Sequence, residues 1–270
     1  MARIIYHIGV TRFRTALIIL ILCTGLLLRL HNYAIYPQRG ASSDEYTYAF
    51  LGVSLLTKHV PISWSAFTAY KNVTHLTIDN LYFPIVSPYF DHPPLNGLVV
   101  ASWSILFGQD TFEEISLQTI RLVPIFLSMI SSILVFLLGF RLYNFKIAIW
   151  ALLIYSTATI FVMNGRVVFA ENLLTPLVLL TIYLFSSFKK HLTTKKVLLL
   201  SLFCGLSFWT KELGIVTFLS ILYLFISEKM KHKYTLLLTG TSIFIILLYI
   251  VYGIYYDKNL FFSDNLFPSQ

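Results

Sequence analysis

The chain is organised around the stretch SSDEYTYA (residues 42–49), which places two adjacent carboxylates, Asp44 and Glu45, in an otherwise apolar protein. Shortly before it, residues 15–30 form an apolar run that is preceded by basic residues and no acid. Such a run has about the length that a transmembrane helix needs. The two carboxylates are therefore expected at a membrane face.

Composition places the whole chain in the membrane. Of its 270 residues 57% are hydrophobic and only 12% are charged, and the mean hydropathy is +0.76. Soluble domains carry about 25% charged residues. The net charge of +8 does not indicate nucleic-acid binding, because the basic residues form short clusters between apolar runs, which is typical of cytoplasmic loops. Cys23 and Cys204 both lie inside apolar runs and are expected to be small buried side chains.

Seven apolar segments are interpreted as membrane spans. They cover residues 15–30, 121–140, 147–164, 172–188, 197–210, 214–227 and 234–256. The weakest assignment is 197–227, where Lys211 and Glu212 separate two short runs; a single helix would carry both charges at mid-membrane. The fold class that follows is an all-α polytopic membrane protein.

A further apolar segment, residues 95–108, decides the topology. It is short for a span and is flanked by acids. If it stays at the outer interface, 12 of the 20 basic residues fall in inner segments together with a single acid, Glu228. If it crosses, three later basic clusters move outside. The positive-inside rule favours the first arrangement, with a cytoplasmic N-terminus and an extracytoplasmic loop over residues 31–120.

Within this loop, residues 45–57 show apolar and aromatic positions at helical spacing and predict an amphipathic helix on the membrane surface. Residues 95–108 predict a second surface helix. The sequence between them assigns no structure to the part that contains Pro61, Pro84 and Pro88.

Ionisable residues that lie next to apolar sequence gather on the extracytoplasmic side in this topology. Placing ionisable groups next to the apolar part of a membrane costs free energy unless they are paired or hydrated, so their grouping indicates a site. Asp44 and Glu171 each lie beside apolar sequence, and a carboxylate there suits a general base or a cation ligand. The sequence contains no phosphate-binding glycine loop and no HExxH or CxxC metal spacing. On the residues alone, His92 before two prolines is as readily structural as functional.

Four motifs in order resemble the GT-C superfamily of integral-membrane glycosyltransferases, closest to protein O-mannosyltransferases and bacterial aminoarabinose lipid A transferases (family 39 and 83 type). The first motif is the Asp-Glu pair with its helix, and the second is DHPPL (residues 91–95) at the end of the first outer loop. The third combines Asn164-Gly165-Arg166 with Ala170-Glu171-Asn172, and the fourth is Thr210-Lys211-Glu212. The four motifs match in order and spacing across roughly residues 15–230. The chain departs from the family at His92, where many relatives carry Lys, and at Glu212, where they carry Gly.

The resemblance implies a site and a reaction. Asp44 would be the general base for inverting attack of an acceptor hydroxyl, with Glu171 as a second acid and Glu45 as a further catalytic candidate. His92, Arg166 and Lys211 would bind the phosphate of a polyprenyl-phosphate sugar donor. No cofactor is required and no metal is assigned, although a weak divalent-cation site at Asp44 and Glu171 stays open.

The partners and the setting follow from the same resemblance. They are the lipid-linked donor and a protein, lipid or glycan acceptor, with no nucleic acid, in a multi-pass protein, expected in the plasma membrane, with an extracytoplasmic active site. Relatives continue with more spans, so residues 1–270 would correspond to one GT-C-like domain, the catalytic half. The alternative is a non-catalytic polytopic membrane protein, either a truncated GT-C module or a lipid-carrier transporter.

Overall fold

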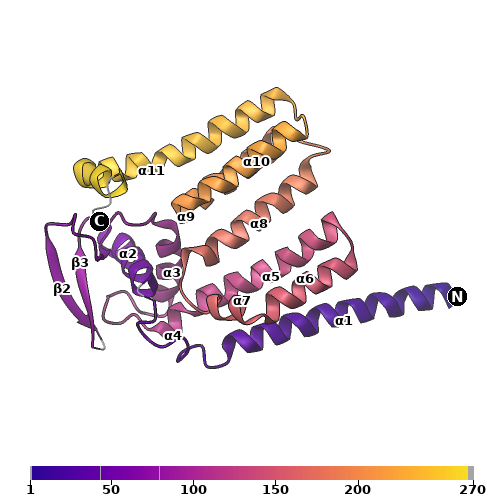
Figure 1. Cartoon of the computed structure of the whole chain (residues 1–270), viewed down its shortest axis with the longest axis horizontal. Coiled ribbons are helices and arrows are strands. Elements are labelled where there is room, and N and C mark those ends of the chain that lie inside the picture. Colours follow the sequence, from indigo (N-terminus) through magenta and orange to yellow (C-terminus); the bar gives the residue numbers. More distant parts are fainter. Residues whose placement is uncertain (1, 43, 79, 267–270) are drawn as a thin grey trace.

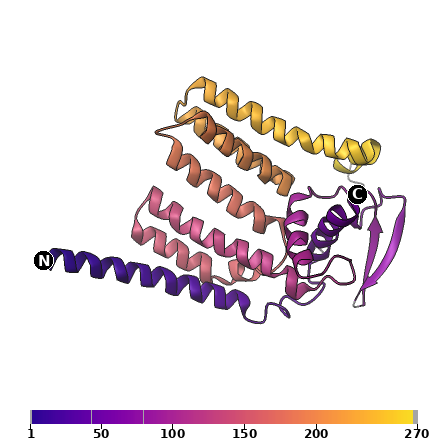
Figure 2. The same ribbon diagram turned by 180° about the vertical axis from the view of Figure 1, so that it is seen from behind.

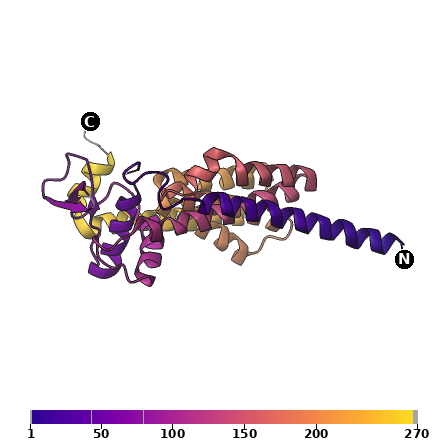
Figure 3. The ribbon, with the colours of Figure 1, turned by 90° about the horizontal axis from the view of Figure 1, so that it is seen from below.

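The computed structural model describes residues 2–42, 44–78 and 80–266 and is mostly helical. The long helices lie side by side in a row, which Figure 1 shows from the front and Figure 2 from behind. Seen from below, α1 projects beyond the other helices at its N-terminal end (Figure 3). The row contains α1 (Ala2–Leu30), α5 (Leu122–Leu142), α6 (Phe145–Thr157), α8 (Ala170–Phe188), α9 (Thr194–Thr210), α10 (Ile215–Ser227) and α11 (His232–Leu266).

Four helices are long and apolar enough to cross a membrane. They cover Arg12–Leu30, Leu117–Leu142, Ala170–Phe188 and His232–Ser263. Shorter apolar helices occupy Leu95–Leu106, Phe145–Thr157 and Glu212–Ser227. The protein is therefore a helical membrane protein, while seven crossings remain a prediction. Each predicted span nevertheless coincides with a helix of the row.

The two ends of the row differ in chemistry. The turns between α5 and α6, α8 and α9, and α10 and α11 lie at the same end as the N-terminus, and residues 31–120 lie at the other end (Figures 1 and 2). The basic clusters around Lys146, Lys189 and Lys231 are thus at one end, and the acid-bearing loop is at the opposite end. This is the segregation that the positive-inside rule associates with the two faces of a membrane.

Two helices of the long loop, α2 (Asp44–Lys58) and α3 (Leu95–Leu106), lie where the sequence predicts helices. They pack directly against each other: a Cβ on Gly52 would lie 1.9 Å from the carbonyl oxygen of Gly97. α2 differs from the predicted amphipathic surface helix, because every residue from Glu45 to Ser54 is buried. Its aromatic residues, including Tyr46 and Phe50, pack into a core shared with the loop.

A small antiparallel sheet departs from the expected all-α class. Its order is β1-β3-β2, formed by β1 (Ser63–Trp64), β3 (Leu81–Val86) and β2 (Val73–Ile78). Phe83 and Ile85 of β3 pack against α2, which explains the burial of that helix. Asn80, in the turn between β2 and β3, has a φ of 65°, a left-handed conformation that asparagine tolerates well.

Two predicted spans differ in detail from the helices observed. The segment 147–164 is divided into α6 and the short α7 (Thr159–Asn164), because Ala158 adopts an extended conformation with ψ 132°. The last helix continues past residue 256, but Asp257 has φ −164° and ψ 102° and kinks it. The segment after the kink lies beside the strands and loops of residues 59–90 (Figure 1).

The C-terminal end of α1 is fixed by a buried arginine. Arg29 donates hydrogen bonds to Ser128 Oγ at 2.7 Å, to the Ser156 carbonyl at 2.9 Å and to the Tyr155 and Gly25 carbonyls at 3.1 Å. Its side chain is fully buried, and these four acceptors are all uncharged. They tie α1 to α5 and α6.

Candidate active site

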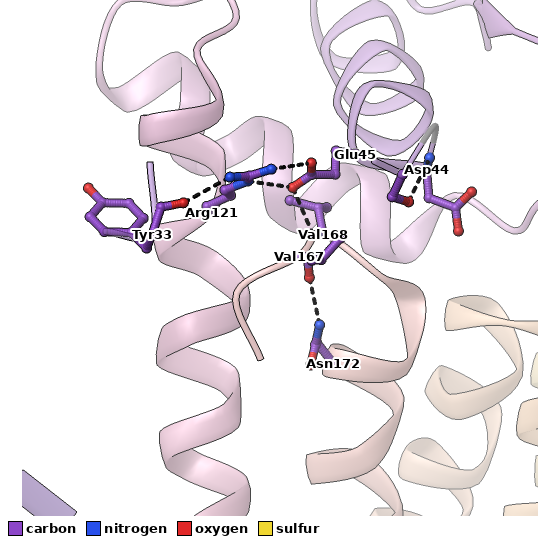
Figure 4. Close-up of polar contacts among 8 residues, drawn as sticks. Tyr33, Asp44, Glu45, Arg121, Val167, Val168 and Asn172 are labelled. Atoms are coloured by element: carbon purple, nitrogen blue, oxygen red, sulfur yellow. Dashed lines mark hydrogen bonds and ion pairs between the residues drawn. The ribbon is translucent and has the colours of Figure 1, made fainter. Parts of the chain in front are cut away.

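The start of α2 is anchored by a buried ion pair. Arg121, at the junction between the short α4 (Leu117–Ile120) and α5, donates from Nε and Nη2 to the two carboxylate oxygens of Glu45, each at 2.8 Å. Its Nη1 donates to the Tyr33 carbonyl at 2.8 Å, and the Val168 amide donates to Glu45 at 3.4 Å (Figure 4). The Glu45–Arg121 pair thus joins α2 to α5, to the segment after α1 and to the segment before α8. The contacts give Glu45 a structural role.

Asp44 precedes Glu45 and faces a different direction. Successive helical residues point about 100° apart, and in Figure 4 the Asp44 carboxylate points away from the Glu45–Arg121 pair. Asp44 is half-buried, and its amide donates to Ser42 Oγ at 3.3 Å. Together with His92, it lines a cavity of about 150 Å³. Because Glu45 is fixed by Arg121, the adjacent Asp44 is held where its carboxylate is accessible from the cavity.

His92 enters the same cavity from the motif that precedes α3. Its ring stacks on Tyr48 with the ring centroids 5.3 Å apart, and Tyr89 meets it edge-on at 6.4 Å. Pro93 and Pro94 follow, and α3 begins at Leu95. Because proline restricts both its own backbone and that of the preceding residue, the motif holds the ring in one place.

Burial lowers the pKa of His92, and the nearby charges act in opposing directions on it. The carboxylates of Asp44 and Glu171 raise that pKa, while the ammonium of Lys211 lowers it. The net shift is downward, so His92 is neutral at pH 7 and can offer one N–H donor. These charges come from three different helices, since Asp44 begins α2, Glu171 lies in the first turn of α8 and Lys211 follows α9.

Glu171 and Lys211 form an ion pair at 2.5 Å. Glu171 lies in the first turn of α8, where a carboxylate is favoured by the helix dipole, and Lys211 is the extended residue that ends α9. Both side chains are partly exposed, at 51% and 30%. The pKa of Tyr48 is raised, first by burial and then by the negative charges of Asp44, Glu171 and Glu212. The Glu171–Lys211 pair thus joins the start of α8 to the end of α9.

Arg166 lies elsewhere. Its Nη2 donates to the Leu28 carbonyl of α1, and its Nη1 contacts the Met163 sulfur at 3.7 Å. The side chain is 7% exposed, and its Nε has no hydrogen-bond partner among the described residues. Burial and the positive charge of Arg121 lower the pKa of Arg166. The structure therefore places Arg166 against the end of α1, whereas His92 lines the cavity with Asp44 and Lys211 pairs with Glu171.

Sequence reasoning missed two residues that build the site. Arg121 was taken only as the first residue of a span, although a buried cation there requires a nearby carboxylate such as Glu45. Tyr70 had no signal in the sequence; its hydroxyl donates to Asp91 at 2.5 Å and accepts from the Phe90 amide at 2.9 Å. Asp91 also accepts from Ser65 Oγ at 2.6 Å, so the loop before β2 is held against the His92 motif.

No group of three or more His, Cys, Asp or Glu side chains that could hold a metal ion is found among residues 2–42, 44–78 and 80–266. Asp44 and Glu171 both act on His92 but come from different helices, and the carboxylate of Glu171 is taken by Lys211.

The model of one protein family, described as dolichyl-phosphate-mannose-protein mannosyltransferase, matches residues 91–252. The chain belongs to this family. The match begins at Asp91, so it contains His92, Arg166, Glu171 and Lys211, whereas Asp44 and Glu45 lie before it. No curated protein and no solved structure matches the chain significantly. The family and the apolar helices identify a membrane glycosyltransferase of the mannosyltransferase-like kind.

Proposed function

We propose that this mannosyltransferase-family protein moves a sugar from a polyprenyl-phosphate donor to a hydroxyl acceptor, with inversion, at the extracytoplasmic membrane face. Asp44 is the general base. The observation that carries the proposal is the cavity that Asp44 and His92 line, at the end of the helix row where the Glu171–Lys211 pair joins the start of α8 to the end of α9.

Asp44 has the surroundings that a base needs. Its carboxylate is half-buried and directed away from Arg121, the cation that neutralises its neighbour Glu45. A positioned carboxylate that takes the proton of an attacking hydroxyl contributes about 10²–10⁴-fold to a rate. As the hydroxyl attacks the anomeric carbon, the bond to the phosphate oxygen breaks, and the proton passes to Asp44.

The leaving phosphate needs positive charge or hydrogen-bond donors, which lower the barrier where negative charge develops. Lys211 supplies the ammonium, and Glu171 holds that ammonium in place at 2.5 Å. His92, whose pKa is lowered, contributes an N–H without charge. Arg166 reaches the phosphate only after releasing the Leu28 carbonyl, so we assign it a smaller share of phosphate binding.

The orientation is part of the proposal. With the basic turns on the cytoplasmic side, the N-terminus is cytoplasmic and the cavity of Asp44 faces outward in the plasma membrane. The polyprenyl tail then lies in the bilayer, with its phosphate at the ends of α8 and α9.

The experiment is a transfer assay in membranes with radiolabelled polyprenyl-phosphate sugars. Asp44→Asn removes the base and keeps the shape, and the matched control is Asp110→Asn, an exposed acid of the same loop. We expect transfer to fall by about 10²–10⁴-fold in the first variant and to stay at the wild-type level in the control. Equal rates in wild type and Asp44→Asn would refute the assignment of the base. No transfer from well-folded protein with any donor would favour the non-catalytic alternative. A chelator in the assay tests the divalent-cation role left open for Asp44 and Glu171.

A further inference from the structure

A second and larger cavity, of about 590 Å³, lies next to the catalytic one. Three segments line it: residues 69–72, the pair Ser87 and Pro88, and the end of α11 at Asp257, Asn259, Leu260 and Ser263. Its volume is within the range of about 300–1,000 Å³ that is usual for small-molecule sites. Apart from Tyr70, whose hydroxyl binds Asp91, none of its lining residues belongs to the site described above.

The two cavities share a partition. Tyr70 lines the large cavity, and its hydroxyl donates to Asp91, which lines the small cavity with Asp44 and His92. Ser87 and Pro88 on one side are followed directly by Tyr89 on the other. A ligand that extends around this partition can therefore contact both cavities.

The kink in α11 closes the large cavity. Asp257 leaves the helical conformation, and its carboxylate accepts from the Leu260 amide at 3.0 Å, so it caps the next helical segment. The Tyr256 hydroxyl donates to the His59 carbonyl at 3.0 Å, which fixes this end of α11 on the loop. The lining residues after the kink are thus held in position against those of the loop.

The chemistry of the lining selects the ligand class. It offers hydroxyls and amides, one cation at Lys71 and one anion at Asp257. The balanced charge does not favour a phosphate, and the apolar side chains of Ala69, Pro88 and Leu260 alternate with polar ones and form no continuous run. Amide and hydroxyl groups both donate and accept hydrogen bonds, which matches a ligand that carries many neutral hydroxyls.

We propose that this cavity binds a neutral oligosaccharide, the glycan part of the acceptor whose terminal hydroxyl is delivered to Asp44. The acceptor role rests on the proposed function, whereas the binding of the saccharide does not. The transfer step is unchanged: the acceptor oxygen bonds to the anomeric carbon, the phosphate leaves, and Asp44 receives the proton.

The test measures binding without any donor. Purified full-length protein in detergent is titrated with mannotriose, maltotriose and chitotriose, and binding is followed by saturation-transfer NMR. Asn259→Ala removes one lining amide, and Asn259→Trp fills the cavity. Lys258→Ala and Lys258→Trp are the matched controls, because Lys258 is the exposed neighbour that does not line the cavity. Thermal unfolding verifies that all four variants fold.

We expect at least one trisaccharide to bind the wild type. Binding should be about tenfold weaker in Asn259→Ala, because the loss of one hydrogen bond raises the Kd by about that factor, and Asn259→Trp should not bind. Both Lys258 variants should bind as the wild type does. Absence of binding for all three sugars, or equal binding in Asn259→Trp, would overturn the inference. So would a serine- and threonine-rich peptide or inorganic phosphate that binds there instead. Because no transfer is measured, a failed transfer assay leaves this result intact.

Discussion

Removing Arg121 should destabilise the protein far more than removing an exposed cation. In Arg121→Met, the carboxylate of Glu45 stays fully buried and loses both bonds of 2.8 Å. Breaking a buried ion pair by deleting one partner costs about 3–5 kcal/mol. Each kcal/mol lowers the melting temperature of a protein of this size class by about 2–4 °C, so we expect a decrease of about 6–20 °C.

The assay is thermal unfolding of purified protein in detergent, followed by intrinsic fluorescence. Lys189→Met is the matched control, because Lys189 also pairs with a carboxylate, that of Glu228 at 2.7 Å, but both side chains are over one-third exposed. Exposed pairs contribute about 0–1 kcal/mol, so this variant should melt within a few degrees of the wild type.

A double variant tests whether the destabilisation comes from the unpaired buried charge. Glu45→Gln with Arg121→Met leaves no uncompensated charge, so it should be less destabilised than the sum of the two single variants. If Arg121→Met melted like the control, or if the two single effects simply added, the buried pair would not be what anchors α2.

Three further predictions concern packing, protonation and transfer. Gly52→Ala should destabilise by about 1–3 kcal/mol in the same melting assay, because its Cβ would overlap α3, whereas Gly240→Ala, with open space, should not. Burial lowers the pKa of His92, so the neutral imidazole contributes fully to stability above pH 6.5, and this contribution is lost as the pH falls through the lowered pKa. The melting temperatures at pH 8 and pH 5.5 should therefore differ less in His92→Gln than in the wild type. Lys211→Met should reduce transfer by about 10²-fold with a stability change below about 1 kcal/mol, since its pair with Glu171 is partly exposed. A larger stability loss in that last variant would assign the pair to folding.

The helices of the row and of the loop could be predicted because each has its own sequence signal. Apolar runs predict the helices of the row, and apolar positions in the loop predict α2 and α3. The sheet had no such signal: most of β2 is exposed, and β3 contains Pro84, which a strand tolerates only at particular positions. Its stability comes from contacts of Phe83 and Ile85 with α2, which are 30 or more residues away in sequence.

The candidate site was predictable in part for the same reason. Asp44, His92 and Lys211 stand beside apolar segments, where a polar residue is conspicuous. The arginines could not be separated in this way, because a guanidinium near a membrane can bind a ligand or tie helices together. Only the contacts distinguish them: Arg121 holds Glu45, and Arg166 reaches the Leu28 carbonyl.

The hydrogen bonds of Arg29 set an order for biogenesis. α1 leaves the ribosome before α5 and α6, and the acceptors of its arginine in those two helices are 99 to 127 residues further along the chain. Until those helices are synthesised, the guanidinium has only the Gly25 carbonyl of its own helix and must stay hydrated at the membrane surface or within the insertion machinery. α1 can therefore take its final position only after α6 has been synthesised, which makes its docking a late event in the assembly of this protein.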